Sequence, residues 1–435
     1  MAGKKEINSF VRSETDLFTE PGYDLSILST TTTEYFPFST LTATSPITFF
    51  IQGNDQQYID FSKTKLKITC KIVDTSGAAL AAETGKTIEY APVNYLIASA
   101  FDHVSVHLNE TEITPKTSLY PYQAYLETIL SYGTEYKKGQ AEAGGFYRVK
   151  DEKSKTDDGF TARTKLCENG TEFELIGRPH GEIFTHSRYM VPGVDARITF
   201  HRAANTFCLM QLGTSIATPV LQIIGASLYI QKVTLLPSLQ LAHLKLWQSQ
   251  PCVYPGKRVE MKSYGLPEKT YQHTNEYLIN GLVPDRLIIG LVLTEAAQGS
   301  YKENPFYFDD FKLSQIVVTC NTESPTQHVI NVDKANSKYT NAFMSLFDAM
   351  GITHCDHGLD LRLAEYIAGK ALFGFDLRNL SDGFAIPRHG NVSIHLKFAT
   401  ALAKGVTVIV YPEYPSVMYI NNNKQIMFKD YAREY

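Results

Sequence analysis

The sequence predicts an all-β fold in which one antiparallel sandwich occurs twice. The first observation is composition: 12% of the 435 residues are aromatic, nearly all of them Tyr and Phe, and together with many Thr, Val and Ile they favour strands. The second is a pair of matching stretches, VPGVDARITFHRA at 191–203 and IPRHGNVSIHLKFA at 386–399. Each has Pro, a Gly-containing turn and then strict alternation of apolar and polar residues, the pattern of a half-buried strand.

Length and charge narrow the class of protein. A chain of 435 residues is long enough for two or three domains. With 43% hydrophobic residues, 20% charged residues and a net charge of −4, we expect a folded soluble protein whose surface is not built to hold nucleic acid. No apolar run reaches the length of a membrane span. The start, MAGKKEINSF, lacks the apolar core of a signal peptide, and the six cysteines form no C-x-x-C pair, so we expect an intracellular chain with free thiols.

The elements of the first copy follow in order. Residues 1–44 carry polar clusters and little periodicity, which predicts an extended arm with at most one or two short strands. Strand signals then arrive at regular spacing, at 47–53, 65–74, 103–109, 173–179, 196–201 and 221–235. Between them, PYQAYLETILSYGTEYKKG at 121–139 has apolar residues at helical spacing, Pro at the start and Gly at the end, which predicts an amphipathic helix. The polar stretch at 139–170 is predicted to be an exposed loop.

The second half repeats this order. Strands are predicted at 258–266, 286–294, 312–321, 370–377, 386–399 and 405–421, and TNAFMSLFDAMG at 340–351 is predicted to be a helix that Gly351 ends. Landmarks of the two halves pair in sequence: the strand ends at Asn109 and Asn321, the two helices, Pro192 with Pro387, and Gly225 with Gly405. The separation between paired landmarks varies between about 220 and 180 residues, as expected when loops differ in length and the order of strands and helices is kept.

The size of each copy selects among sandwich folds. Eight-stranded sandwiches of about two hundred residues, with long loops and an inserted helix, favour a double jelly roll. Immunoglobulin-like repeats are nearer one hundred residues and lack such a helix. The predicted domains are an N-terminal arm at 1–44, a first jelly roll at 45–240, a linker at 241–256 and a second jelly roll at 257–435.

Candidate metal sites are few. A double-cupin enzyme needs histidines on one strand face, and His103, His107 and Glu110 come nearest, although H-x-x-x-H is not that motif. The densest group of potential ligands is GITHCDHGLD at 351–360, in which His354, Cys355 and His357 have a spacing that zinc could use. A polar loop after a helix end is the simpler interpretation. No nucleophile motif such as G-x-S-x-G occurs, so we predict no enzyme activity and no cofactor.

The aromatic helix at 121–139 allows two interpretations. Its tyrosines could face a partner protein, because tyrosine is enriched at interfaces. The favoured alternative is that the helix plugs an open end of its own sandwich.

Several stretches resemble one family. They are SETDLFTEP (13–21), QQYIDFSKTKLKITCKIVD (56–74), PVNYLIASAFDHVSVHLNETEITP (92–115) and, most specifically, YPYQAYLETILSYGTEYKKGQ (120–140). They resemble major capsid proteins of Polinton (Maverick) elements and adintoviruses, and more distantly those of virophages. The resemblance is clearest over residues 13–140 and continues in the rest as strand order.

The resemblance implies a double jelly-roll subunit of a virion. Three chains would form a pseudo-hexagonal homotrimeric capsomer, and capsomers would tile an icosahedral shell around double-stranded DNA, with neighbouring capsomers and a penton or minor capsid protein as partners. It implies synthesis in the host cytoplasm or nucleus and no sequence-specific binding of nucleic acid. The arm would reach to neighbours or inward, and the loop at 139–170 would project outward. Some virophage relatives carry a further C-terminal segment that a protease removes; this sequence stops at KDYAREY (429–435).

Two other functions stay open at this point. One is a double-cupin-type metal enzyme, which a bound transition metal would indicate. The other is a glycan-binding jelly-roll module, which monomers with a saturable sugar site would indicate.

Overall fold

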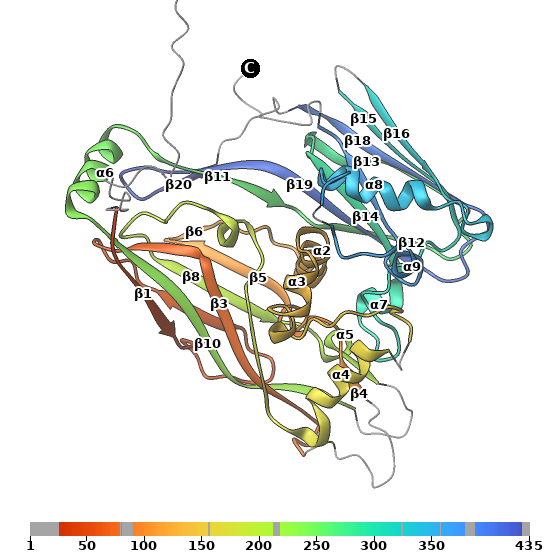
Figure 1. The fold of residues 1–435 in the computed structure, drawn as a ribbon, viewed down its shortest axis with the longest axis horizontal. Coiled ribbons are helices and arrows are strands. Elements are labelled where there is room, and N and C mark those ends of the chain that lie inside the picture. Colours follow the sequence, from red (N-terminus) through yellow and green to blue (C-terminus); the bar gives the residue numbers. More distant parts are fainter. Residues whose placement is uncertain are drawn as a thin grey trace, which may run out of the picture.

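A computed structural model of the chain describes residues 26–78, 80, 90–154, 157–211, 218–322, 325–356, 358–378 and 388–428. Within these residues, antiparallel strands form two sandwiches, with most of the helices between them or along their edges (Figure 1). The first 25 residues of the predicted arm, His357, Pro387 and the last seven residues lie outside the described part. No helix in the described ranges has the length and apolar content that crossing a bilayer requires.

The first sandwich consists of two four-stranded sheets. The first sheet has the order β1 (Ile27–Tyr35), β10 (Val220–Leu235), β3 (Tyr58–Val73), β7 (Phe173–Gly177). The second has the order β2 (Ile47–Ile51), β8 (Ala196–Arg202), β5 (Phe101–Leu108), β6 (Thr111–Glu112). A separate pair is formed by β4 (Tyr90–Pro92) and β9 (Leu209–Gln211).

The second sandwich repeats these two sheets. One has the order β11 (Cys252–Val259), β19 (Val406–Ile420), β14 (Arg286–Leu293), β17 (Leu372–Asp376), and β12 (Lys262–Leu266) and β20 (Ile426–Phe428) also pair with β19. The other has the order β13 (Gln272–Leu282), β18 (His389–Phe398), β15 (Leu313–Asn321), β16 (Thr326–Asn331).

The two copies share one topology. If each copy is numbered separately, with β4, β9 and β20 set aside and β11 and β12 counted as one bent strand, both read 1-8-3-6 and 2-7-4-5. This is the antiparallel double-sheet arrangement of a jelly roll. The two stretches that first suggested a duplication form β8 and β18, the seventh strand of each copy, and each pairs with the fourth. The predicted double jelly roll is confirmed.

Both predicted helices follow the fifth strand of their copy. In the first copy, α2 (Tyr120–Ser131) has Pro in its first turn and is followed, after Gly133, by the separate helix α3 (Thr134–Lys138). In the second copy, α8 (Thr340–Met350) ends at Gly351, whose φ of 69° suits glycine. The other helices are α1 (Leu96–Ser99), α4 (Asp158–Leu166), α5 (Asn205–Cys208), α6 (Pro237–Ser249), α7 (Thr294–Gln298) and α9 (Leu363–Ile367), with 3-10 turns at Glu142–Gly144, Glu168–Gly170, Glu182–Thr185 and Lys334–Asn336.

The prediction of an exposed loop at 139–170 is wrong. This stretch contains α4, and Phe146, Val149 and Phe160 within it are buried. The charged residues of this stretch predicted exposure, but Arg148 pairs with Asp360 and Glu365 of the second copy and is largely removed from solvent.

The predicted domain limits can be compared with the helices and strands that lie at them. Strand β1 falls within 1–44 and pairs along its length with β10, so this part of the predicted arm is an edge strand. Helix α6 and the start of β11 occupy most of 241–256. The division at these limits remains a prediction.

The core follows the alternation that the sequence shows. On β18, Val392, Ile394, Leu396 and Phe398 are all fully buried, and on β8 so are the residues of matching parity. Buried apolar side chains of both copies form one continuous cluster. The two jelly rolls therefore share a core across their junction.

Candidate functional site: the junction and the outer sheet faces

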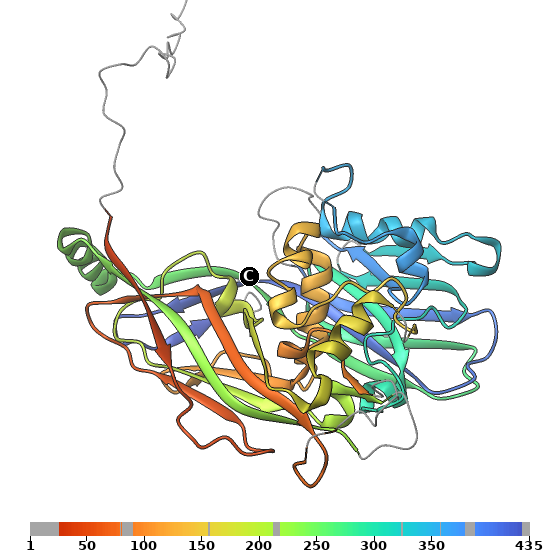
Figure 2. The same ribbon diagram turned by 60° about the horizontal axis from the view of Figure 1, so that its bottom comes forward.

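Helix α2 lies at the junction between the two jelly rolls (Figure 2). The Tyr125 ring stacks on the Phe306 ring with centroids 4.1 Å apart and planes 3° apart. Tyr122 meets Phe306 edge-on at 5.7 Å and also contacts Phe308. Both phenylalanines are fully buried and lie between β14 and β15 of the second copy. The helix is largely buried within its own chain, and its tyrosines join one copy to the other, so it packs at the junction and does not merely close an end of its own sandwich.

A buried carboxylate continues this contact. Glu152 accepts a hydrogen bond of 2.9 Å from the Tyr125 hydroxyl and one of 3.0 Å from the Asn304 amide. Burial raises the pKa of Glu152, while the charges of Lys370 and Arg163 oppose that shift. Asn304 belongs to the second copy, so the carboxylate links the two copies through neutral donors on either side.

A second set of charges lies beside it. Arg148 pairs with Asp360 at 3.1 Å and with Glu365 at 2.8 Å, and both carboxylates are almost fully buried. Lys370 donates to the Val149 carbonyl at 2.8 Å. Breaking one partner of such a buried pair typically costs about 3–5 kcal/mol, since the other charge is left without compensation. The junction therefore fixes how the two jelly rolls sit against each other.

Lys137 is a buried base at the junction. Its ammonium donates to the carbonyls of Ile129 and Leu359, from the first and second copies respectively. Burial lowers its pKa to about 7, against the opposing charge of Asp360. Its charge therefore changes near neutral pH.

The first copy also covers the outer face of the second copy's sheet. The Tyr254 hydroxyl on β11 accepts from the Val191 amide at 3.0 Å and donates to the Tyr189 carbonyl at 3.2 Å. On β19, burial and the charge of Glu127 on α2 raise the pKa of Tyr411. Every residue from 408 to 414 of β19 is buried, on both faces of the strand.

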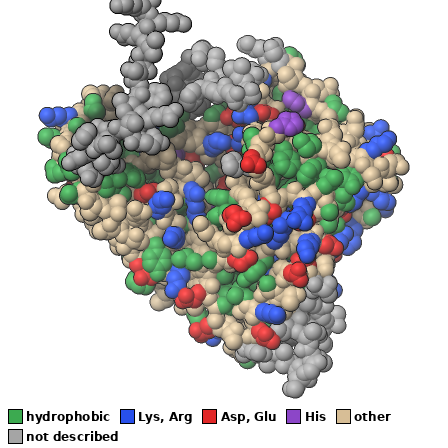
Figure 3. Space-filling view, in the orientation of Figure 1, with side chains coloured by type: hydrophobic (Ala, Val, Ile, Leu, Met, Phe, Trp, Pro, Cys, Tyr) green, Lys and Arg blue, Asp and Glu red, His purple; other side chains and the backbone are tan. Residues whose placement is uncertain are grey.

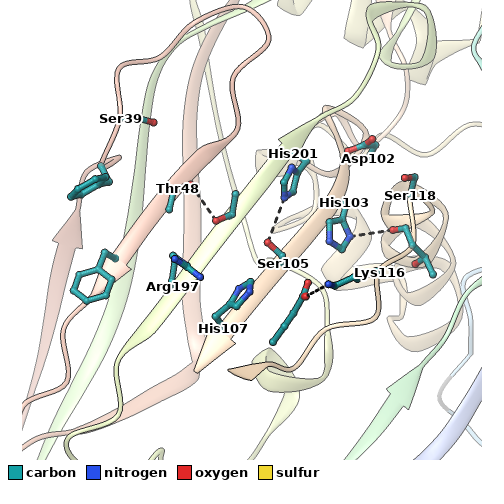
Figure 4. A pocket seen from close by; sticks show the side chains of 15 residues that line it. Ser39, Thr48, Asp102, His103, Ser105, His107, Lys116, Ser118, Arg197 and His201 are labelled. Carbon is teal, nitrogen blue, oxygen red and sulfur yellow. Dashed lines mark hydrogen bonds and ion pairs between the residues drawn. The ribbon is translucent and has the colours of Figure 1, made fainter. Parts of the chain in front are cut away.

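The histidines considered for a cupin-type site do not face the interior of their sandwich. His103 and His107 point to the outer face of β5, whereas Val104 and Val106 between them point into the core. They line an open groove of about 970 Å³, in which the His103 and His201 rings lie 5.2 Å apart (Figure 4). Burial lowers the pKa of both His103 and His107.

The ligand-rich loop after α8 is not assembled as a metal site in the described residues. Cys355 is exposed, His354 has a left-handed backbone with a φ of 60°, and Asp360 is engaged by Arg148. Among the residues that the structure describes, no three His, Cys, Asp or Glu side chains are grouped to hold a metal ion.

The junction residues Phe306, Phe308, Asn304 and Glu152 were not singled out from the sequence. They belong to no motif, and they lie in segments that read as connections between strands. The available signal was the aromatic run FYF at 306–308, which is unusual for a solvated connection.

Comparison with known proteins starts from sequence. No protein-family model matches the chain. An uncharacterized protein of Caenorhabditis elegans is 23% identical over 386 residues, which cover 86% of this chain and 91% of that protein.

Comparison of structures finds matches over nearly the whole chain. A chain of the Sputnik virophage matches with a TM-score of 0.64 at 10% identity, covering 98% of this chain and 93% of that one. The fold is a double jelly roll. The mavirus major capsid protein matches with a TM-score of 0.54 at 12% identity, covering 98% and 97%. The Faustovirus major capsid protein matches with a TM-score of 0.54 at 9% identity, covering 93% and 92%.

Proposed function

We propose that this chain is a structural major capsid subunit. The observation that carries the proposal is that its two jelly rolls match capsid subunits from end to end, 98% of this chain against 97% of the mavirus protein. An inserted or truncated domain would have left part of one chain without a counterpart.

The finer proposal concerns assembly. Three chains form a pseudo-hexameric homotrimer, because three copies of a duplicated domain supply six similar walls around one three-fold axis. These capsomers tile an icosahedral shell around double-stranded DNA, beside a penton or minor capsid protein. The narrower assignment to the Polinton or adintovirus type rests on the resemblance of residues 13–140.

The role is structural and not catalytic. The outward placement of His103 and His107 leaves apolar side chains inside the first sandwich at this strand, so the cupin alternative has no supporting geometry there. Metal analysis of the purified protein and a sugar-binding titration provide the two direct checks of the alternatives.

The test of the proposal is the mass of the purified protein by light scattering, with negative-stain images of the same peak. A particle of three times the 48.7-kDa chain mass with a hexagonal outline, or larger shells, is expected. A strict monomer over the whole accessible concentration range contradicts self-assembly. A monomer that binds a sugar saturably would instead support the glycan-binding module.

A further inference from the structure

The open groove of about 970 Å³ lies on the outer face of the sheet β2-β8-β5-β6. At one end, Phe50, Arg197 and His107 stand in one row across β2, β8 and β5, because Phe50 pairs with Arg197 and Arg197 pairs with His107. At the other end lie His201 and Asp102 (Figure 4). Four residues of β8, or about 13 Å of strand, separate Arg197 from His201. The arginine and the aspartate therefore occupy opposite ends of the groove.

The charge of Arg197 is not compensated by its neighbours. Its side chain is exposed, and it forms no ion pair with any residue that the structure describes. Glu112, the partner of His107 on β6, is paired with Lys116 at 2.9 Å. On the face of the molecule shown in Figure 3, by contrast, Lys and Arg side chains lie close to Asp and Glu side chains. A guanidinium left open in this way can take a carboxylate in a two-pronged hydrogen bond.

Aromatic side chains flank this arginine. Phe50 is 47% exposed and Phe38, which lines the same groove, is 84% exposed. Exposed aromatic rings beside an arginine are typical of the centre of a binding surface. A ligand that suits this end of the groove carries a carboxylate next to an apolar side chain.

The stretch of chain before β1 has this composition. Residues 13–25 read SETDLFTEPGYDL, with four carboxylates and no Lys or Arg. Asp16 is followed by Leu17 and Phe18, and Asp24 lies between Tyr23 and Leu25. Each of these two triplets places an acidic group directly beside apolar side chains.

The same stretch starts close enough to reach the groove. β1 and β2 are the edge strands of the two sheets and contact each other. Ser26, just before β1, is hydrogen-bonded to the start of α6, and α6 is hydrogen-bonded to Asp55, just after β2. Arg197 lies opposite Phe50, near the end of β2. Eight extended residues, from Ser26 back to Phe18, span about 26–29 Å, whereas the two sheets of a sandwich are about 10 Å apart.

We propose that the Arg197 end of the groove binds residues 14–25 of the same chain, with a carboxylate on Arg197 and an apolar side chain against Phe50. The bound segment turns around the edge that β1 and β2 form. It thereby covers a sheet edge whose open backbone groups could otherwise pair with other chains. The contact lies within one chain, so it does not depend on the proposed self-assembly.

Carbodiimide cross-linking of the full-length wild-type protein tests the contact. The reagent should join Lys116 to Glu112, whose Nζ and Oε2 atoms are 2.9 Å apart, and this link is the internal positive control. We expect carboxylates of residues 14–24 to be linked to Lys116 at least about tenfold more often than to Lys269, because binding raises their effective concentration at the groove. Lys269 is the reference, with a side chain 87% exposed.

Mass spectrometry identifies the links in the band of single-chain mass on a denaturing gel. A Lys116–Glu112 link without any link from Lys116 to residues 14–24 overturns the inference. Links to that segment found only in a band of doubled mass also overturn it, because they join two chains. Both results leave the proposed function standing.

Charge reversal tests the role of the arginine. In Arg197→Glu, the links from Lys116 to residues 14–24, relative to the Lys116–Glu112 link, should fall at least about fivefold, because an attraction becomes a repulsion. The matched variant Lys269→Glu should leave this ratio unchanged. Circular dichroism checks that both variants are folded, and Arg197→Gln replaces Arg197→Glu if the latter does not fold. Equal ratios in the folded variants overturn the inference.

Discussion

The stack of Tyr125 on Phe306 makes the coupling of the two jelly rolls measurable. Phe306 is fully buried, stacks on Tyr125 at 4.1 Å and meets Tyr122 edge-on. Replacing a buried phenylalanine by alanine costs about 3–5 kcal/mol of the free energy of unfolding. Of this, about 0.5–1.5 kcal/mol for each aromatic pair depends on ring geometry, so Phe306→Leu should recover much of the loss but not these pair contributions.

The position of the lost ring makes the effect more than a uniform destabilisation. Phe306 belongs to the second copy, while both tyrosines belong to the first. We therefore expect urea unfolding of Phe306→Ala, followed by tyrosine fluorescence and circular dichroism, to separate into two transitions that coincide or nearly coincide in the wild type.

Phe398→Ala is the matched control. Phe398 is as fully buried as Phe306 but lies on β18, inside the second sandwich. Its loss should cost a similar free energy and mainly weaken the unfolding of the second copy. If Phe306→Ala gives the same unfolding curve as Phe398→Ala, the ring does not couple the two jelly rolls and the reasoning from the stack is refuted.

Three further predictions concern titration and reactivity. Burial lowers the pKa of His103, so as the pH drops the imidazole is protonated in the unfolded chain before it is protonated in the folded one. The free energy of unfolding should therefore fall below about pH 6.5. Urea denaturation of His103→Gln between pH 7.5 and 5.5 should show a weaker dependence of this free energy on pH. Because the pKa of Lys137 is lowered to about 7, the wild type should gain stability relative to Lys137→Met as pH rises from 7 to 10, and a pH-independent difference would contradict the burial of its charge. Iodoacetamide should modify exposed Cys355 in the native protein well before buried Cys70, whose pKa burial raises; mass spectrometry of timed samples shows the order, and early loss of Cys70 thiol would refute its burial.

The architecture was predictable because its signal is local and repeated. Alternation at 196–201 and 389–398 specifies strands with one buried face, and the matching order of strands and helices specifies two copies. Pro121 and Gly351 mark the start of one inserted helix and the end of the other. Each of these features depends on neighbours in the sequence.

The junction was not predictable in the same way. Tyr125 and Phe306 are far apart in the sequence. The residues around Tyr125 give no indication that it contacts Phe306, and the residues around Phe306 give none for Tyr125. The charged residues at 148–163 predicted a solvent-exposed loop. The sequence around a charged residue does not show which distant residue of opposite charge will pair with it. The pairing of Arg148 with Asp360 is visible only once the two copies are placed together.

The double-sided burial of β19 has a consequence for the order in which the chain can fold. During synthesis the first jelly roll leaves the ribosome first, and its alternating strands can turn their apolar faces toward each other, while Tyr122 and Tyr125 of α2 find Phe306 only when the second copy follows. The second jelly roll emerges with a strand, VTVIVYPEYPSVMYI at 406–420, that is apolar over much of both faces. Until it is covered, the apolar run 406–411 at the start of that strand would be exposed to water. By the time this strand emerges, the segment before β8 is already made and can contact Tyr254 on the neighbouring β11, so the order of the two halves lets the earlier one cover part of the later one.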